Sequence, residues 1–166
     1  MHKMTGVPGD DSQSILNNVR EIACDFASQR SERQRRRELV TEDFDRLRES
    51  GYLMVAVPTT FGGIWDGDTV GTRMVCEILK TLAHGDSSVA LVAAMHPAVI
   101  QSTGWTSISE APEPYSEAWD EQRRWAFQTV QDGHFWGTII SEPGSGGDNT
   151  QSSSSAKLLS NGVQYL

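Results

Sequence analysis

The segment SSVALVAAMHPAVIQ, residues 87–101, constrains the fold of this chain more than any other. Its apolar residues surround the whole circumference of a helix instead of forming one stripe, which is the pattern of a helix buried on all sides. We therefore predict that it lies at the centre of the core. Pro97 has no backbone N–H, so this helix should kink or restart near His96.

Amphipathic segments on both sides of this one can cover it. Apolar residues at three-to-four spacing predict a helix from Ser14 to about Gln29, after a flexible segment over residues 1–13. Further helices are predicted over residues 41–51, 68–85 and 116–133. Short connections between such helices favour a mainly α fold, an antiparallel bundle that spans residues 14–133.

Polar residues that cap helices mark three of the starts. Thr41 is expected to cap the helix that it begins, and Asp68 or Thr69 the next one. Asp86 follows the stop signal of Gly85 and is expected to cap the apolar segment.

Two stretches between the helices are predicted to lack helical structure. YLMVAVP, residues 52–58, should be extended because Pro58 cannot continue a helix. TTFGGIWDGD, residues 59–68, is predicted as a loop from its glycine and aspartate residues. Trp65 in this loop either covers a ligand cleft or anchors the loop in the core.

The last part of the chain changes from helical to strand composition. HFWGTIIS, residues 134–141, and GVQYL, residues 162–166, are rich in aromatic and β-branched residues and are predicted as strands. Two strands do not form an independent sheet. Residues 134–166 are therefore expected to be the start of a truncated β domain, with more of it in the full gene.

Composition and charge exclude several classes of function. A formal net charge of −8 argues against a protein that coats nucleic acid, because that role needs a basic face. The longest apolar stretch is too short to cross a bilayer, and we expect a cytoplasmic protein. Cys24 and Cys76 have no zinc-type spacing, so reduced structural thiols and no metal site are expected. The basic block SERQRRREL, residues 31–39, is either a patch for a phosphate or a partner, or a solvated helix face, which is the favoured interpretation.

The loop SEPGSGGD, residues 141–148, has the composition of an anion-binding turn. Pro143 fixes one φ angle, and the glycines permit positive φ, so that successive N–H groups converge on an anion. Ser141 adds a hydroxyl at the preceding strand end. A phosphate, a pyrophosphate or the edge of a flavin suits such a turn; by composition alone a Gly/Ser connector is the competing interpretation.

Three segments in the same order resemble the acyl-CoA dehydrogenase superfamily of flavoproteins, which also includes oxidases and flavin monooxygenases. They are ESGYLMVAVPTTFGG, EILKTLAHGDSSVALVAAMH and IISEPGSGGD. The resemblance implies an N-terminal α domain, a middle β domain and a C-terminal helical domain, with FAD, or alternatively FMN, bound between domains of a homotetramer. It also implies α,β-dehydrogenation of an acyl-CoA substrate by the full-length protein. The catalytic base of the family lies in the C-terminal region, so no catalytic residue is expected in this chain, which should be inactive alone.

The resemblance assigns five residues to the cofactor. Thr138, Ile140 and Ser141 would face the flavin ring, and Gly146 and Gly147 would approach the flavin or its phosphates through backbone N–H groups. Gly147 stands where the family has a serine, and this departure favours a flavin monooxygenase as an alternative. His96 is either a substrate-side residue of such an enzyme or, as we favour, a core histidine bonded to a backbone carbonyl. A non-catalytic helical module that binds a partner is the remaining alternative.

Overall fold

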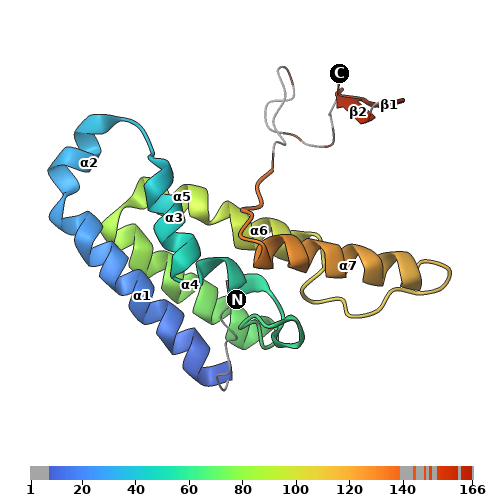
Figure 1. The fold of residues 1–166 in the computed structure, drawn as a ribbon, viewed down its shortest axis with the longest axis horizontal. Helices are drawn as coiled ribbons and strands as arrows, with labels where there is room; N and C mark the ends of the chain where they lie inside the picture. The colour runs from blue at the N-terminus through green and yellow to red at the C-terminus, as the bar shows by residue number, and fades with distance from the viewer. Residues whose placement is uncertain are drawn as a thin grey trace.

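The computed structural model describes residues 8–138, 144, 148, 150, 153–160 and 162–165, and this part of the chain is mainly helical, as predicted (Figure 1). The helices are α1 (Pro8–Ser28), α2 (Arg30–Arg36), α3 (Thr41–Glu49), α4 (Asp68–Gly85), α5 (Ser87–Ala93), α6 (Met95–Ser102) and α7 (Ser116–Gln131). Two 3-10 helices, η1 (Tyr52–Ala56) and η2 (Thr59–Phe61), connect α3 to α4. The strands are β1 (Ala156–Leu159) and β2 (Gly162–Tyr165).

The two longest helices, α1 and α4, lie side by side and form one wall of the core (Figure 1). Val19 and Phe26 of α1 and Ile78 of α4 are fully buried between them and their neighbours. The α1 helix begins at Pro8, so residues 8–13 are helical and not part of a flexible segment as predicted. Proline is favourable in the first turn of a helix, where an N–H would have no partner within the helix.

The junction between α4, α5 and α6 follows the local signals in the sequence. Asp86 caps α5: its Oδ1 accepts hydrogen bonds from the N–H groups of Ser88 at 2.9 Å and Val89 at 3.1 Å. The apolar segment breaks between Ala93 and Met95, so that Pro97 lies in the first turn of α6. Both predictions, the cap and the restart near His96, are confirmed.

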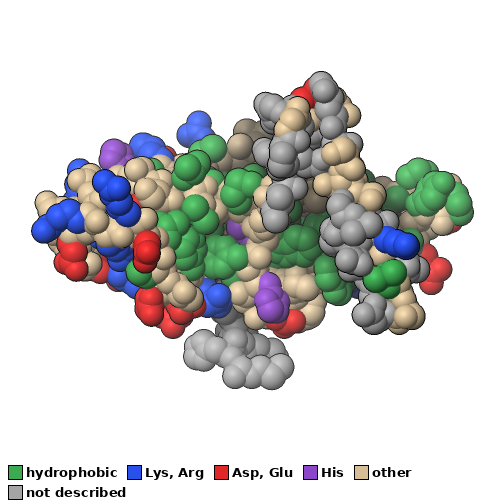
Figure 2. Space-filling view, turned by 90° about the horizontal axis from the view of Figure 1, so that it is seen from above, with side chains coloured by type: hydrophobic (Ala, Val, Ile, Leu, Met, Phe, Trp, Pro, Cys, Tyr) green, Lys and Arg blue, Asp and Glu red, His purple; other side chains and the backbone are tan. Residues whose placement is uncertain are grey.

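The prediction that this apolar segment is surrounded on all sides is wrong. Val89 and Ala93 are fully buried, but Leu91 is 72% exposed, Val92 46% and Met95 37%. One face of α5 and the start of α6 is thus partly exposed in the part of the chain that the structure describes. Figure 2 shows hydrophobic side chains gathered over the middle of the upper face of the molecule, beside the charged end that carries α2.

The YLMVAVP segment folds as the 3-10 helix η1 and is not extended, contrary to prediction. Gly51 has a φ of +86° and turns the chain directly after α3. The Tyr52 hydroxyl donates to the carbonyl of Ala93 at 2.8 Å, which holds η1 against α5. A short apolar run does not separate a strand from a helical turn by its periodicity. The extended backbone resumes only at Val57.

The loop after η1 is anchored in the core by Trp65, which is 6% exposed. Pro58 and Trp65 form an isolated bridge, and a Cβ on Gly71 would lie 2.5 Å from the indole ring. Of the two interpretations of Trp65, the structure therefore supports the hydrophobic anchor. The predicted cap by Thr41 is wrong, because Val40 holds the N-cap position and makes no side-chain hydrogen bond.

Two strands pair near the C-terminal end of the described chain. β2 falls within the predicted GVQYL strand, but its antiparallel partner is β1, with Ala156 opposite Tyr165 and Leu159 opposite Gly162. The predicted strand over residues 134–141 is wrong for residues 134–138, which have no regular structure. The rest of that segment lies outside the described residues. Strand composition in this stretch instead reflects aromatic side chains that pack against the helices.

The arginine block is not simply a solvated face. Arg33 of α2 is 9% exposed, and its guanidinium stacks over the ring of Phe26 at 3.7 Å. It donates through Nη2 to Asp43 and through Nε to Asp86, both at 2.7 Å. Arg36 also pairs with Asp43, at 2.5 Å. This ion network ties the short α2 helix to α3 and to the start of α5, so the favoured interpretation is wrong at Arg33.

Candidate functional site

The candidate flavin site begins where the chain leaves α7. Of the predicted contacts, Thr138 is described, and it is exposed and outside regular structure. The other predicted contacts, Ile140, Ser141, Gly146 and Gly147, lie outside the described residues. Gly144 has a φ of +91°. A turn with positive φ and an exposed hydroxyl fit the donor-rich loop that a flavin would need.

Trp136 fixes the backbone two residues before Thr138. Its backbone N–H donates to Nδ1 of His96 at 3.0 Å, and its indole Nε1–H donates to the Thr129 hydroxyl at 2.9 Å. The indole also makes edge-to-face contacts with Trp105 and Trp125, whose ring centroids lie 5.2 and 5.6 Å away. The start of the candidate loop is therefore held by both backbone and side-chain contacts.

Phe135, which precedes Trp136, packs among aromatic side chains of the helical region. Its ring centroid lies 5.7 Å from that of Phe44 and 5.5 Å from that of His96, both in edge-to-face arrangements. It also stacks on Tyr52 at 6.4 Å. Such aromatic pairs contribute about 0.5–1.5 kcal/mol each beyond the area that they bury. The long-range partners of these aromatic residues are not visible in any local sequence pattern.

His96 is the centre of this arrangement. Its side chain is 1% exposed, and Nε2 lies 2.9 Å from the carbonyl oxygen of Leu53. Because Nδ1 accepts the Trp136 N–H, the proton must lie on Nε2, where it is donated to Leu53. Burial lowers the pKa of His96, which favours this neutral form. The structure thus places His96 as the favoured core histidine and brings it to the base of the candidate loop.

The neutral state of His96 predicts a loss of stability in acid. The folded-state pKa lies below the ordinary value of 6.5, so the unfolded chain takes up this proton first as the pH falls. The stability that His96 contributes is complete above that value and is lost below it, at up to about 1.4 kcal/mol per pH unit. The free energy of unfolding in urea, measured one pH unit above and one pH unit below 6.5, should show this loss in the parent chain.

Two variants test the source of the pH effect. His96→Gln should be less stable at both pH values but should lack the histidine part of the pH dependence. His84→Gln, which changes an exposed histidine, should keep it. If lowering the pH reduced the stability of His96→Gln as much as that of the parent chain, the prediction would be contradicted.

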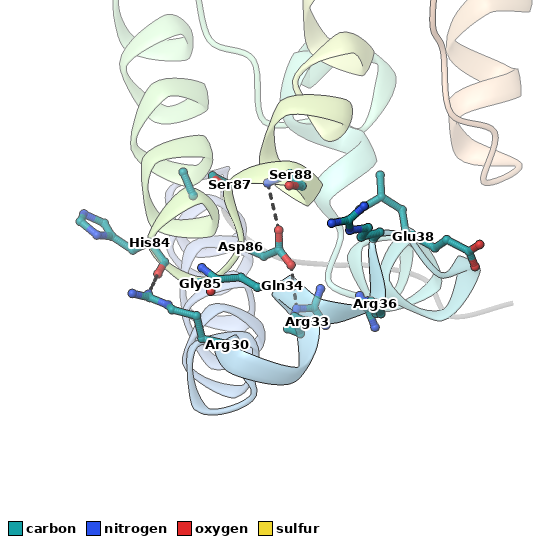
Figure 3. A pocket seen from close by; sticks show the side chains of 13 residues that line it. Arg30, Arg33, Gln34, Arg36, Glu38, His84, Gly85, Asp86, Ser87 and Ser88 are labelled. Atoms are coloured by element: carbon teal, nitrogen blue, oxygen red, sulfur yellow. Dashed lines mark hydrogen bonds and ion pairs between the residues drawn. The ribbon is translucent and has the colours of Figure 1, made fainter.

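A second feature, a pocket of about 600 Å³, lies at the α2 end of the molecule (Figure 3). Arginines from α2 and its C-terminal end face the junction of α4 and α5 across it. Figure 3 shows Arg30 directed toward His84, whose carbonyl it reaches through Nη2 at 2.7 Å. Arg33 and Asp86 meet at the base of this pocket. Sequence reasoning named a phosphate patch here only as the weaker interpretation.

Other site types receive no support from the described residues. Within them, no group of three or more His, Cys, Asp and Glu side chains is placed to hold a metal ion. None of the described helices is both long and apolar enough to cross a membrane. Cys24 and Cys76 are free thiols at exposed positions.

Comparison with known proteins identifies the family of the helical region. A family model described as "Acyl-CoA dehydrogenase, N-terminal domain" matches residues 9–110, from the first turn of α1 to the connection that precedes α7. No curated protein and no solved structure matched the chain. The matched range is more than half of the 166 residues. The chain therefore belongs to the acyl-CoA dehydrogenase family, of which it contains the N-terminal domain.

Proposed function

We propose that this chain is the N-terminal part of an FAD-dependent oxidoreductase of the acyl-CoA dehydrogenase type, and that the loop after Trp136 forms one edge of its flavin site. The observation that carries the proposal is the anchored exit from α7. Hydrogen bonds through His96 and Thr129 fix Trp136 on a family-typical helical domain, directly before the exposed Thr138. Residues that follow such an anchor start from a defined position, as a binding loop requires.

We assign a role in flavin binding to four residues of the proposed loop. The hydroxyls of Thr138 and Ser141 would donate hydrogen bonds toward the ring of a bound flavin, while the N–H groups of Gly146 and Gly147 would donate toward the ring or the phosphates. When bound, FAD supplies a two-electron acceptor for oxidation of a CH–CH bond next to a thioester. Donors that are already oriented stabilise negative charge at such an acceptor without reorganisation. None of these residues is proposed as the catalytic base.

The substrate is proposed to be an acyl-CoA thioester. Flavin-dependent monooxygenation is a second candidate, because Gly147 lacks the hydroxyl that the family has at this position. The burial of His96, with both ring nitrogens bonded, removes the other feature that favoured a monooxygenase. Anaerobic bleaching of the flavin by an acyl-CoA would support dehydrogenation, whereas substrate hydroxylation with reduced flavin and oxygen would support the second candidate.

Flavin binding is tested on the product of the complete reading frame that contains this chain. The purified protein is expected to carry a yellow chromophore that is released as FAD on denaturation. Ser141→Ala should weaken FAD binding about tenfold through loss of a hydrogen bond to a charged acceptor. Ser155→Ala, an exposed serine in the connector, is the matched control and should bind FAD as the parent does. A folded, colourless protein that takes up no added flavin would refute the proposal.

A further inference from the structure

The pocket between α2 and the α4–α5 junction concentrates positive charge in an acidic protein. The chain has a net charge of −8, yet Arg30, Arg33, Arg36 and Arg37 all line this one pocket. Its lining has two carboxylates, Glu38 and Asp86. A ligand can bind only those guanidinium groups that have N–H donors left.

Arg33 has a structural role, because all three of its guanidinium nitrogens are already bonded to buried or half-buried carboxylates. Its Nε donates to Asp86, and Nη1 and Nη2 donate to Asp43 at 3.1 and 2.7 Å. Asp86 is likewise engaged, by Arg33 and by the N–H groups at the start of α5. Arg33 and Asp86 thus neutralise each other and form a fixed base for the pocket.

The other three arginines keep unused donors. Arg30 is exposed and uses one nitrogen, Nη2, for the His84 carbonyl. Arg36 likewise uses Nη2 for Asp43. Arg37 makes no hydrogen bond or ion pair with any described residue, and its φ of +55° turns the chain at the end of α2. Arg36 already pairs with Asp43, which lies outside the lining. Among the described residues, Arg30 and Arg37 have no carboxylate partner, and Glu38 is the one lining carboxylate left to offset them.

We propose that this pocket binds a small molecule through a phosphate or diphosphate group, with Arg30, Arg36 and Arg37 as its ligands. The planar guanidinium group donates paired hydrogen bonds that match phosphate oxygens. The volume of about 600 Å³ is that of a small-ligand site. An acidic protein segment needs an extended groove, so a compact phosphate-bearing ligand fits better. The lining includes none of the candidate flavin residues, and the proposal does not depend on the proposed oxidoreductase function.

Calorimetric titration of the purified chain with inorganic pyrophosphate, and separately with inorganic phosphate, tests the proposal. Arg30→Gln and Arg37→Gln change exposed side chains, so both variants should fold, and their melting temperatures verify this. Each should weaken pyrophosphate binding about tenfold, since each removes a charge-assisted hydrogen-bond donor. Arg35→Gln is the matched control, because Arg35 bonds to the Ser31 carbonyl and does not line the pocket.

The outcomes separate a built site from simple charge attraction. Binding that Arg37→Gln and Arg30→Gln weaken and that Arg35→Gln leaves within about twofold supports the proposal. Equal losses in all three variants would show attraction to net charge alone and would overturn it. No heat of binding at about 10 mM pyrophosphate, a dissociation constant too weak for a specific site, would also overturn it. So would binding of a polyglutamate peptide without binding of pyrophosphate.

Discussion

Arg33→Met is expected to lower the free energy of unfolding by about 3 kcal/mol, among the largest single effects in this chain. The substitution leaves Asp43, which is 4% exposed, with only Arg36 as a charged partner. It also leaves Asp86 without the Nε donor of Arg33. The methionine keeps an unbranched apolar side chain over Phe26, so the loss reports mainly on charge and not on packing. Urea denaturation, followed by far-ultraviolet circular dichroism, measures it.

An exposed ion pair provides the control for this prediction. Lys80 and Glu77 lie 3.5 Å apart with side chains 65% and 46% exposed, and Lys80→Met should cost about 0–1 kcal/mol. Asp86→Ser keeps a capping oxygen but removes the charge, so the cycle of Arg33→Met and Asp86→Ser isolates the coupling between these two residues. A cost for Arg33→Met no greater than that for Lys80→Met would refute the structural role given to Arg33.

Gly63→Ala is expected to destabilise the fold by about 3 kcal/mol, the upper part of the usual range for overpacking. A Cβ at this position would lie 2.0 Å from the Val57 carbonyl oxygen and 2.5 Å from the Val57 Cβ. The obstacle is largely backbone, and the Gly63 N–H is bonded to the Pro58 carbonyl at 3.1 Å, so the turn cannot widen without breaking that hydrogen bond. The second glycine of the FGG sequence is thus needed for close approach.

Gly67→Ala is the matched control in the same loop. Gly67 has a φ of +78°, but a Cβ there meets nothing within 4 Å. Its φ of +78° and ψ of 164° lie in a region that essentially only glycine adopts, so its cost should be about 1–3 kcal/mol from the backbone alone. Thermal unfolding of both variants compares crowding with backbone conformation. If Gly67→Ala proved the more damaging of the two, the close contact at Gly63 would not be the controlling feature.

Elements specified by nearby residues were predictable from the sequence. Asp86 caps α5, and Pro97 separates α5 from α6, because each acts on backbone groups within a few residues of itself. The α4 helix also has its predicted limits at residues 68 and 85, although Gly67, and not Asp68 or Thr69 as predicted, holds its N-cap position. Each of these signals acts over less than two helical turns, so a single sequence contains all the information that they need.

Features that depend on distant partners were not predictable. The Tyr52 hydroxyl holds η1 against Ala93, 41 residues away, and the buried Arg33 pairs with Asp86, 53 residues further on. The aromatic residues after α7 have strand composition, but their packing against the helices replaces a sheet ladder. Composition indicates which residues can be buried, but it does not indicate which residues they pack against.

The candidate flavin loop shows the same division. Its glycines and hydroxyls are visible in the sequence, and the family assignment agrees with the helical region that precedes it. The anchor is not visible, because His96 joins Leu53 and Trp136, which are 43 and 40 residues away. Neither residue lies in a motif that predicts the other, so the position of the loop follows from the tertiary structure.

The tryptophan residues around Trp136 also provide an intrinsic fluorescence signal. Three of the protein's five tryptophans, Trp105, Trp125 and Trp136, form a chain of edge-to-face contacts with Trp136 in the middle. Rings at such short distances exchange excitation energy, so the emission of the cluster responds as a unit to its surroundings. Because Trp136 lies two residues from Thr138, an event in the adjoining loop would change the intrinsic fluorescence without any added label.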